Sequence, residues 1–404
     1  MRCLYLVSDD PISPNYRGGA SAMYYDQLLA LSDLGHEIDL WHFASRAARE
    51  RFNQEIAEHP QTWSAVKERC RSVRVSTLAV SPGLLDRLMT RASAMVPQSL
   101  PPCRHDLQAE MARQVLEMKP DVVWAQHFAP AIAAIRATRL PIVYVHHDWL
   151  YRIKALRNNR PVDLRQKRLE EQLVRRAAAV VTGSKTEHDE IASLRGQGVH
   201  YIPVSYESVS VNTSRGECER QPLLVHLGGM GATASRDGLL SFFDKAWPSV
   251  SQFGLKFRVV GDVADAPAKL KDYLARVECT GFISDLQSVL RPFDLNLIPW
   301  GHATGQRTRL PVAFNHAQVV VAVRAGVACY PEAQDGLNCR LVETVEQMPG
   351  MIAELAGDAE QRFRLGCAAK STFETSFVRK ALLPRYAEVL AHVAANKPTG
   401  GEAP

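Results

Sequence analysis

The chain opens, over residues 2–42, with the stretch RCLYLVSDDPISPNYRGGASAMYYDQLLALSDLGHEIDLWH. Its apolar run Arg2 to Ser8 predicts a strand, the Pro- and Gly-rich segment Pro11 to Gly19 a loop, and the periodicity of Ala20 to Leu34 a helix. A glycine and a histidine end that helix, and Glu37 to His42 predicts the next strand. Two strands joined through a helix form a βαβ unit, so this stretch predicts a parallel sheet.

The same alternation continues through the first half of the chain. Helix-length segments lie at Asp106 to Met118 and Leu164 to Arg176. Further strands are predicted at Ser72–Leu78, Val122–Ala125, Ile142–His146, Ala178–Thr182 and His200–Ile202. Alternating strands and helices indicate an open, doubly wound α/β sheet, which binds ligands beyond the carboxyl ends of its strands.

A second domain is predicted after a polar, irregular stretch, Ser205 to Gln221, which we interpret as the interdomain linker. The strand pattern then restarts at Leu223–Leu227, Lys256–Val260, Val277–Thr280, Leu295–Ile298, Val319–Val323 and Cys339–Val342. One intervening helix is expected at Gly238 to Trp247. We therefore expect two Rossmann-like domains facing across a cleft, at residues 1–205 and 220–376, with a helix at 377–395 crossing back to the first domain.

The composition limits the class of protein. With 404 residues and 46% hydrophobic side chains, the chain is long enough for two domains, because single cores stop growing at roughly 250 to 300 residues. A net charge of +5 is too small for a typical nucleic-acid-binding protein, so we expect no nucleic-acid partner. Eight cysteines without paired spacing predict reduced thiols. The sequence has no signal-peptide pattern and no run of about 18 apolar residues, so we expect a cytoplasmic protein.

Two stretches carry residues suited to an anionic ligand. Trp300 to Ala313 runs from a strand end through a loop into a helix and contains Arg307 and Arg309. Two guanidinium groups at this spacing can clamp a diphosphate, although a solvated basic turn has the same sequence pattern. The Gly18-Gly19 pair, between the first strand and helix, can let backbone amides approach an anion or a sugar, or simply form a tight turn.

The order of several motifs resembles the family 4-type glycosyltransferases, which have the GT-B fold. The matching segments are Gly18 to Glu37, Asp121 to His127, Ala178 to Glu187, Val225 to Met230 with Asp237 to Leu239, Lys256 to Asp262, Thr280 to Phe282 with Asp285-Leu286, and Phe293 to Leu295. Because the matches are in the family's order and span nearly the whole chain, they are more specific than any single motif.

The resemblance implies a set of site residues. Arg309 stands where a subgroup of the family has a lysine that contacts the donor diphosphate, and Arg307 is the neighbouring basic residue. His127 falls where the family places a histidine near the transferred sugar, so His127, Arg307 and Arg309 are the expected catalytic residues. The expected donor-binding residues are Gly18, Gly19, Gly228, Gly229, Gly231, Gly281, Phe282, Thr304, Gly305, Arg307 and Arg309.

The chain departs from the family at two glutamates spaced eight positions apart, where it has Thr304 and Val312. The second glutamate grips the ribose, and its loss removes a charge-assisted bond of roughly 1.5 to 3 kcal/mol. Ala317 and Val319 likewise replace a usual glycine and proline. The open explanations are an unusual donor, ribose binding by another group such as His316 or Asn315, or lost activity.

We expect transfer of a sugar from a nucleotide-sugar donor to a hydroxyl of a glycan, lipid-linked or small-molecule acceptor, in cell-surface polysaccharide or glycoconjugate synthesis. The resemblance implies retention of anomeric configuration. Paired arginines without an Asp-x-Asp motif favour a reaction that needs no metal and no cofactor. Two alternatives stay open: a GT-B enzyme with another donor class, such as a nucleoside monophosphate sugar, or a non-catalytic relative that binds a glycan or a partner enzyme.

Three weaker features complete the expectations. Arg152 to Arg176 carries nine basic residues and three acidic ones, which indicates either a solvated helix face or a surface for an anionic acceptor or the inner membrane face. The spacing of His146, His147 and Asp148 cannot place all three side chains in one site, and we expect one of them to line the cleft. His226 lies in an apolar strand, which favours a structural role in the core.

Overall fold

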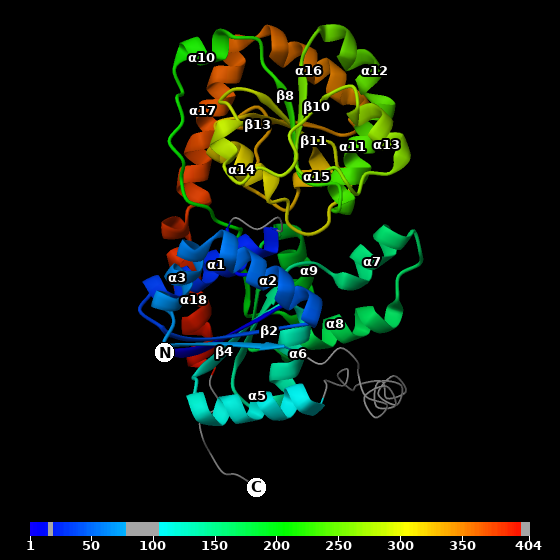
Figure 1. Cartoon of the computed structure of the whole chain (residues 1–404). Helices are drawn as coiled ribbons and strands as arrows, with labels where there is room; N and C mark the ends of the chain where they lie inside the picture. Colours follow the sequence, from blue (N-terminus) through cyan, green and yellow to red (C-terminus); the bar gives the residue numbers. More distant parts are fainter. Residues whose placement is uncertain (15–18, 78–104, 397–404) are drawn as a thin grey trace. The chain divides into compact units, whose positions relative to one another are not determined.

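The computed structural model describes residues 1–14, 19–77 and 105–396. The chain divides into two compact units. The N-terminal unit comprises Met1–Pro203 together with the chain from Leu382 onward, and the C-terminal unit comprises Val204–Ala381. Both are built around an open parallel sheet, as the sequence predicts, and Figure 1 labels their elements.

The N-terminal unit has a sheet of seven described strands in the order β3-β2-β1-β4-β5-β6-β7. These are β1 Arg2–Ser8, β2 Glu37–Ala44, β3 Ser72–Thr77, β4 Val122–Gln126, β5 Ile142–His146, β6 Ala179–Thr182 and β7 Val199–Tyr201. Its helices are α1 Gly19–Asp33, α2 Arg46–Glu58, α3 Pro60–Arg69, α5 His105–Met118, α6 Phe128–Ala137, α7 Leu150–Asn158, α8 Leu164–Arg176 and α9 Lys185–Arg195. The strand order reverses between β1 and β4, which makes their carboxyl ends the topological switch point.

The C-terminal unit has a sheet of six strands in the order β10-β9-β8-β11-β12-β13. They are β8 Leu224–Leu227, β9 Phe257–Val260, β10 Glu278–Cys279, β11 Leu295–Ile298, β12 Val319–Val323 and β13 Cys339–Val342. Helices are α10 Arg215–Glu219, α11 Thr233–Lys245, α12 Trp247–Val250, α13 Ala268–Leu274, α14 Arg309–Asn315, α15 Arg324–Val327, α16 Met348–Gly357 and α17 Ala359–Ser376, with 3-10 turns at Ser251–Phe253, Leu286–Ser288 and Val345–Gln347. Here the order reverses between β8 and β11.

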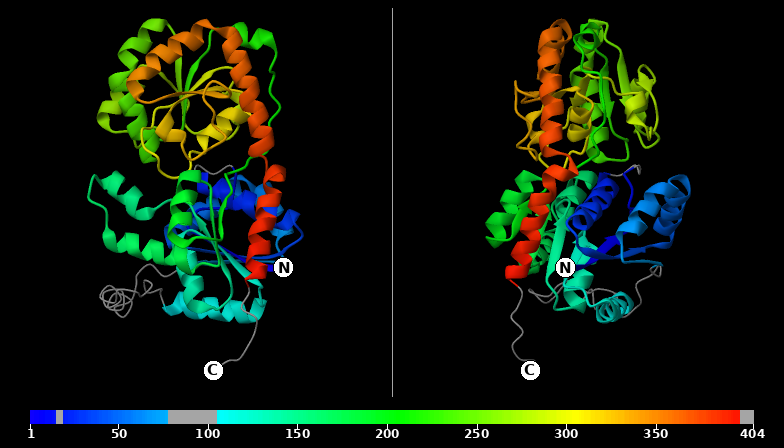
Figure 2. Two further views of the ribbon diagram at one scale, coloured as in Figure 1. Left: turned by 180° about the vertical axis from the view of Figure 1, so that it is seen from behind. Right: turned by 90° about the vertical axis from the view of Figure 1, so that its left-hand side faces the viewer.

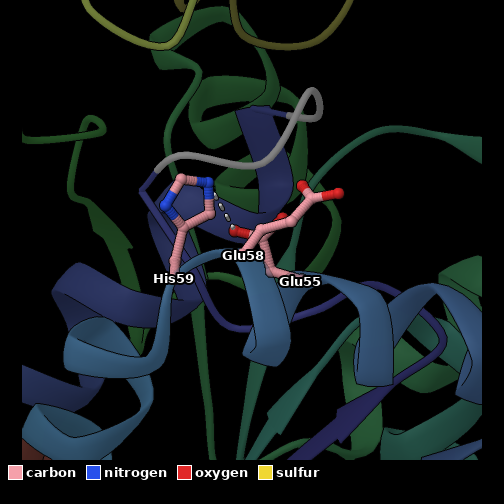
Figure 3. A group of neighbouring side chains, drawn as sticks. All are labelled: Glu55, Glu58 and His59. Carbon is pink, nitrogen blue, oxygen red and sulfur yellow. Dashed lines mark ion pairs between the residues drawn. The ribbon is translucent and has the colours of Figure 1, made fainter.

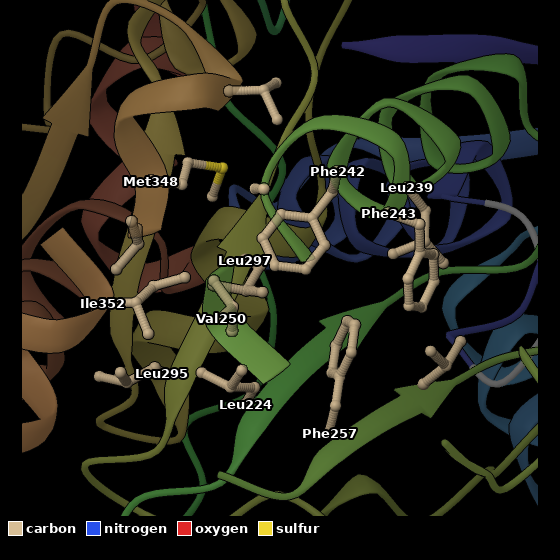
Figure 4. Close-up of a cluster of buried hydrophobic side chains, with 14 of the residues drawn as sticks. Leu224, Leu239, Phe242, Phe243, Val250, Phe257, Leu295, Leu297, Met348 and Ile352 are labelled. Atoms are coloured by element: carbon tan, nitrogen blue, oxygen red, sulfur yellow. The ribbon is translucent and has the colours of Figure 1, made fainter. Parts of the chain in front are cut away.

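Strand β12 shows why the C-terminal sheet is buried on both faces. Val319, Val321 and Val323 pack into one core with Phe242, while Val320 and Ala322 pack into a second core on the opposite face. Successive side chains of a strand point to opposite faces, so a run of five apolar residues can serve two cores at once. Figure 4 shows the first of these cores, and Figure 2 shows helices on both sides of the sheet.

The long helix α18, Arg379–Ala395, belongs to the N-terminal unit from Leu382 onward. The ring of Tyr386 lies 6.0 Å from that of Trp124 on β4. The guanidinium of Arg385 lies 5.4 Å from the Tyr201 ring and donates a hydrogen bond of 3.3 Å to the Tyr201 carbonyl. These contacts attach α18 to strands at the centre and the edge of that sheet.

The expected irregular linker was wrong at one point, because Arg215–Glu219 forms the short helix α10. Arg362 of α17, which is buried, donates hydrogen bonds to the carbonyls of Cys218 and Arg220. A guanidinium that satisfies the carbonyls at the end of α10 holds this polar segment against the C-terminal unit. Among the described helices, none has both the length and the apolar character needed to cross a bilayer.

Replacing Phe242 by alanine is expected to lower the free energy of unfolding of the C-terminal unit by about 3 to 5 kcal/mol. Phe242 is fully buried, and its ring lies 5.7 Å from Phe257 and 6.4 Å from Trp247. Urea denaturation followed by circular dichroism measures the effect. The matched control is Phe253→Ala, at a side chain that is 36% exposed, and equal losses in both variants would contradict the assignment of this core.

Candidate functional site

The switch point of the C-terminal sheet brings two loops together. One follows β8 and the other follows β11, and these strands are hydrogen-bonded neighbours in parallel register. Because parallel strands end at the same edge, the loop at Gly228 and the loop that begins at Trp300 both leave the sheet there. The sequence-predicted residues Gly228, Thr304 and Arg309 come from these two loops.

Arg309, the first residue of α14, is a cation without a carboxylate partner among the described residues. Its guanidinium donates hydrogen bonds to the Ser235 hydroxyl and, at 3.4 Å, to Nε2 of His226. Burial, reinforced by the neighbouring Arg307, lowers the pKa of Arg309 to about 9. A partly buried guanidinium bonded only to neutral groups is suited to an anion that completes its coordination.

Gly228 lies directly against this guanidinium. Its φ is +135°, and a Cβ at this position would lie 2.7 Å from the Ser235 hydroxyl and 3.2 Å from a terminal nitrogen of Arg309. Gly261 approaches the same turn, since a Cβ there would lie 2.6 Å from the Gly228 carbonyl carbon. Gly229 and Gly231 continue the loop beside Asp262 and Asp265. Only glycine allows the backbone to come this close, so the loop lies directly against the cation.

Arg307 is bonded differently from Arg309. Its guanidinium donates to the Thr304 carbonyl and, at 2.7 Å, to the Thr304 hydroxyl. It also lies 5.9 Å from the ring of Trp300, while its Nε is buried and has no hydrogen-bond partner among the described residues. The turn at Gly305, with φ +53°, lies between them. Arg307 therefore stabilises its own loop and raises the positive potential around Arg309.

Val312 contributes to an apolar cluster instead of a polar site. Its side chain packs against buried Leu223, Val225, Val260 and Leu290. The predicted base-binding residues lie near this cluster in sequence: Gly281, with φ +72°, accepts a hydrogen bond from Gly261, and Phe282 is 41% exposed. The valine thus has a packing role that a glutamate at the same position would not fill.

Of the two residues considered for the ribose, only His316 has a side-chain nitrogen without a hydrogen-bond partner among the described residues. Asn315 is fully engaged, since its amide donates to the Glu207 carbonyl and its oxygen accepts from Val209 and Lys370. His316 pairs through Nδ1 with the Val312 carbonyl at 2.9 Å, whereas its buried Nε2 has no partner among the described residues. Burial lowers the pKa of His316, which keeps its ring neutral and able to bond a hydroxyl.

In the N-terminal unit, His127 follows β4 at the other switch point and caps the start of α6. Its φ of 67° and ψ of 173° fall in a region that is essentially restricted to glycine. The imidazole is half-buried and stacks on that of His147, with ring centroids 3.7 Å apart, while Tyr24 meets both rings edge-on. A strained backbone held by such packing is typical of functional positions.

A buried hydrogen-bond network holds His147 in place. His147 donates from Nε2 to the Gln126 carboxamide oxygen at 3.0 Å. The Gln126 amide donates to the hydroxyl of Tyr5 and to Gln27, both at 2.7 Å, and Gln27 also accepts from Trp124. These bonds connect β1, α1 and β4, so the imidazole stack rests on a rigid base.

His146 and His147 point to different surroundings, as the sequence spacing predicts. His146 is buried, 3.2 Å from the Glu187 carboxylate and hydrogen-bonded to Tyr144, while His147 reaches the stack with His127. Gly19 begins α1, and Gly18 lies outside the described residues.

Sequence reasoning missed Ser235, and it assigned His226 to the core alone. Both contact Arg309, although neither is near it in the sequence. His226 is indeed buried and bonds the Leu297 carbonyl through Nδ1, but its other nitrogen accepts from the guanidinium. The polar side chain of His226 within an apolar strand was the one sequence signal that could have identified His226 as a contact of Arg309.

A separate group of potential metal ligands, Glu55, Glu58 and His59, lies at the end of α2 (Figure 3). Their ligand atoms fall within 4.8 Å of one another. Glu55 already accepts a hydrogen bond from Ser13 and lies 4.0 Å from His59, and Glu58 accepts from Gln54. These neighbours explain the positions of both carboxylates without a further ligand.

The strain at His127 gives a stability prediction. The free energy of unfolding of His127→Gly is expected to exceed that of His127→Ala by at least about 1 kcal/mol, because glycine adopts these dihedral angles without strain. Urea denaturation of the two variants measures the difference. At the neighbouring helical position, Ala129→Gly should lower stability instead, and a loss of the same sign at His127 would contradict the strain.

Acid should destabilise the N-terminal unit through the same stack. Burial, together with the nearby His146, lowers the pKa of His127 from 6.5 to about 4. The unfolded chain then binds more protons than the folded chain between pH 6.5 and 4, so the free energy of unfolding falls as pH drops through this window. Denaturation at several pH values should show a shallower slope for His127→Gln. The control His302→Gln, on an exposed loop, should leave the slope unchanged.

Two protein-family models match this chain, one in each unit. Residues 17–204 match the family model described as Glycosyltransferase Family 4, and residues 221–358 match the model described as Glycosyl transferases group 1. Together the two matches cover β4 with the loop at His127, and β8 and β11 with the loops at Gly228 and Trp300. A comparison with curated proteins found no match.

Several solved structures share the fold at low identity. HepE of Anabaena, solved in complex with UDP, is 17% identical with a TM-score of 0.64, over 97% of this chain and 100% of that one. TarM of S. aureus is 10% identical with a TM-score of 0.68, over 96% of this chain and 98% of that one. Sucrose-phosphate synthase of Thermosynechococcus elongatus is 13% identical with a TM-score of 0.69, over 98% and 99%. The fold is GT-B, and the chain belongs to the glycosyltransferases that join a family 4 domain to a group 1 domain.

Proposed function

We propose that this glycosyltransferase moves a sugar from a nucleoside diphosphate sugar to an acceptor hydroxyl, and that its C-terminal unit binds the diphosphate. The observation that carries the proposal is Arg309, a partly buried guanidinium at the switch point with no carboxylate partner among the described residues. Gly228 brings the loop backbone directly against this guanidinium. HepE of Anabaena, which shares the fold, was solved with UDP and with UDP-glucose, which supports a diphosphate donor.

The arginines supply the charge that departure of the nucleotide requires. In the transfer step the bond between the anomeric carbon and a diphosphate oxygen breaks, and a bond to the acceptor oxygen forms. The acceptor proton passes to the leaving diphosphate. Arg309 would neutralise the developing charge directly. Arg307, which is held in place by its hydrogen bonds to Thr304, would add its own positive charge to the potential around the diphosphate. With two guanidinium groups in this role, we propose a reaction that needs neither metal nor cofactor.

His127 would orient the transferred sugar. Its lowered pKa keeps the imidazole neutral at physiological pH, so it can hydrogen-bond a sugar hydroxyl. We further propose retention of anomeric configuration, by attack on the face from which the diphosphate leaves, as the resemblance to the family 4-type glycosyltransferases implies.

The rest of the donor would be bound by backbone and by His316. Gly281 and Phe282 would hold the base, and the unpartnered Nε2 of His316 would bond a ribose hydroxyl. Because Val312 offers no acceptor, a nucleoside monophosphate sugar stays as a second candidate donor. Binding of one donor class over the other separates these two candidates.

For the acceptor we propose a glycan, lipid-linked or small-molecule hydroxyl in cell-surface polysaccharide or glycoconjugate synthesis. TarM of S. aureus, another protein of this fold, was solved with UDP and alpha-GlcNAc-glycerol. We propose a cytoplasmic protein with peripheral contact at the inner membrane face. The basic stretch between Arg152 and Arg176 motivates this location.

Replacing Arg309 by alanine should weaken donor binding by about 1.5 to 3 kcal/mol, because a charge-assisted hydrogen bond to the diphosphate is lost. Arg307→Ala should weaken donor binding by a similar or smaller amount. Calorimetric titration with the donor found in a thermal-shift screen of UDP-, GDP-, dTDP- and CMP-sugars measures both effects. Arg309→Lys tests whether a point charge replaces the planar guanidinium.

The control is Arg291→Ala, an exposed arginine of the same unit. It should bind the donor as the unchanged chain does. Unchanged affinity in both Arg307→Ala and Arg309→Ala, with intact folding, would reject the diphosphate clamp. Stabilisation by CMP-sugars alone would replace the proposed donor class with the monophosphate class.

A further inference from the structure

Helices α7 and α8 form a hairpin that is fastened at its base (Figures 1 and 2). The Glu170 carboxylate of α8 is buried and accepts hydrogen bonds from the backbone amides of Leu150, at 2.7 Å, and Tyr151, at 3.1 Å. It thereby caps the first turn of α7 and ties the two helices together. The segment that connects α7 to α8 is therefore carried by two helices that are joined at their base.

The tip of this hairpin exposes apolar side chains. Asn159, in the left-handed conformation, ends α7, and the Asp163 carboxylate caps α8 through the amides of Arg165 and Gln166. Val162, between these caps, is 41% exposed, and Leu164, the first residue of α8, is 63% exposed. Two large apolar side chains are thus exposed within three residues at one capped turn.

Exposed basic side chains lie on both helices and on the connection that carries that apolar pair. Leu164 and Arg168 are four positions apart on α8 and so share one helix face. The exposed basic residues of the hairpin near its tip are Lys154, Arg157, Arg160, Arg165 and Arg168. Of the three acidic residues, Asp163 is used by the cap, Glu170 by the base of the hairpin, and Glu171 lies 3.8 Å from Lys167. The tip thus presents positive charge together with exposed apolar side chains.

We propose that this hairpin tip docks on an anionic lipid bilayer, with Val162 and Leu164 inserted at the interface and the nearby basic side chains on the lipid phosphates. The inference rests on the peripheral membrane contact proposed above and assigns its surface. A soluble anionic glycan would match the charges, but it offers no hydrocarbon to the two apolar side chains. Helix α7 begins four residues after the end of β5, and His147 lies in the segment between them. Docking of the tip therefore positions the bilayer relative to the side of the N-terminal unit where His147 lies.

The experiment is co-sedimentation of the full chain with vesicles of phosphatidylglycerol and phosphatidylcholine, or of phosphatidylcholine alone. Binding is expected only to the anionic vesicles and should weaken at high salt. The triple variant Arg157→Gln, Arg160→Gln, Arg168→Gln should bind about 100-fold more weakly, at about five-fold per charge. The double variant Val162→Ser, Leu164→Ser should lose about ten-fold or more.

Matched variants of the C-terminal unit serve as controls. Lys256→Gln, Lys271→Gln, Arg276→Gln removes three exposed charges there, and Phe253→Ser, Leu337→Ser removes two exposed apolar side chains. Both should sediment as the unchanged chain does. Equal loss in the charge control, or full binding by the Val162 and Leu164 variant, overturns the proposal. So does binding to soluble dextran sulfate without vesicle binding, which would indicate a polyanion site. Donor titration of each variant shows separately whether the transferase site is intact.

Discussion

Parallel strand pairing is the constraint on which the rest of the structure depends. Every described strand pair of the two sheets is parallel. A parallel pair needs a crossover, usually a helix, so both faces of each sheet are covered and all strands end at one edge. Where the strand order reverses, the loops on either side run in opposite directions and leave room for a ligand. His127 follows β4 at one reversal, and Gly228 and Trp300 flank the other.

The strands could be predicted closely from sequence because each is a short apolar run bounded by loop residues. Ile142–His146 and Val319–Val323 match their predicted bounds, whereas edge strand β10 is reduced to Glu278–Cys279, since it has a neighbour on one side only. Helices α2 and α3 were not predicted. In α2 the buried residues are Ala48, Phe52 and Glu55, and so sparse an apolar face gives little periodic signal.

The site could be predicted by residue type but not by pairing. Arginine chemistry and position pointed to Arg309, yet its bonds to Ser235 and His226 span more than 70 positions and arise only when β8, α11 and α14 meet. The stack of His127 on His147 is equally non-local. Sequence also treated Arg307 and Arg309 as equivalent, whereas the fold gives one of them a partner in Thr304. Propensity and periodicity describe a residue's own neighbourhood, and these contacts lie outside it.

The packing of Val312 bears on how selective the enzyme is. A site that bonds a substrate hydroxyl rejects the analogue that lacks it, because buried polar groups are then left unpaired, while an apolar pocket discriminates weakly. Val312 packs against the apolar side chains of Leu223, Val225, Val260 and Leu290. The position therefore has no carboxylate that would be left without a hydrogen bond when a donor lacks the hydroxyl. In the donor site that we propose, discrimination between ribose and 2′-deoxyribose donors would then depend on the single nitrogen of His316. Such a site is expected to tolerate donors in which the ribose ring of the nucleotide is altered.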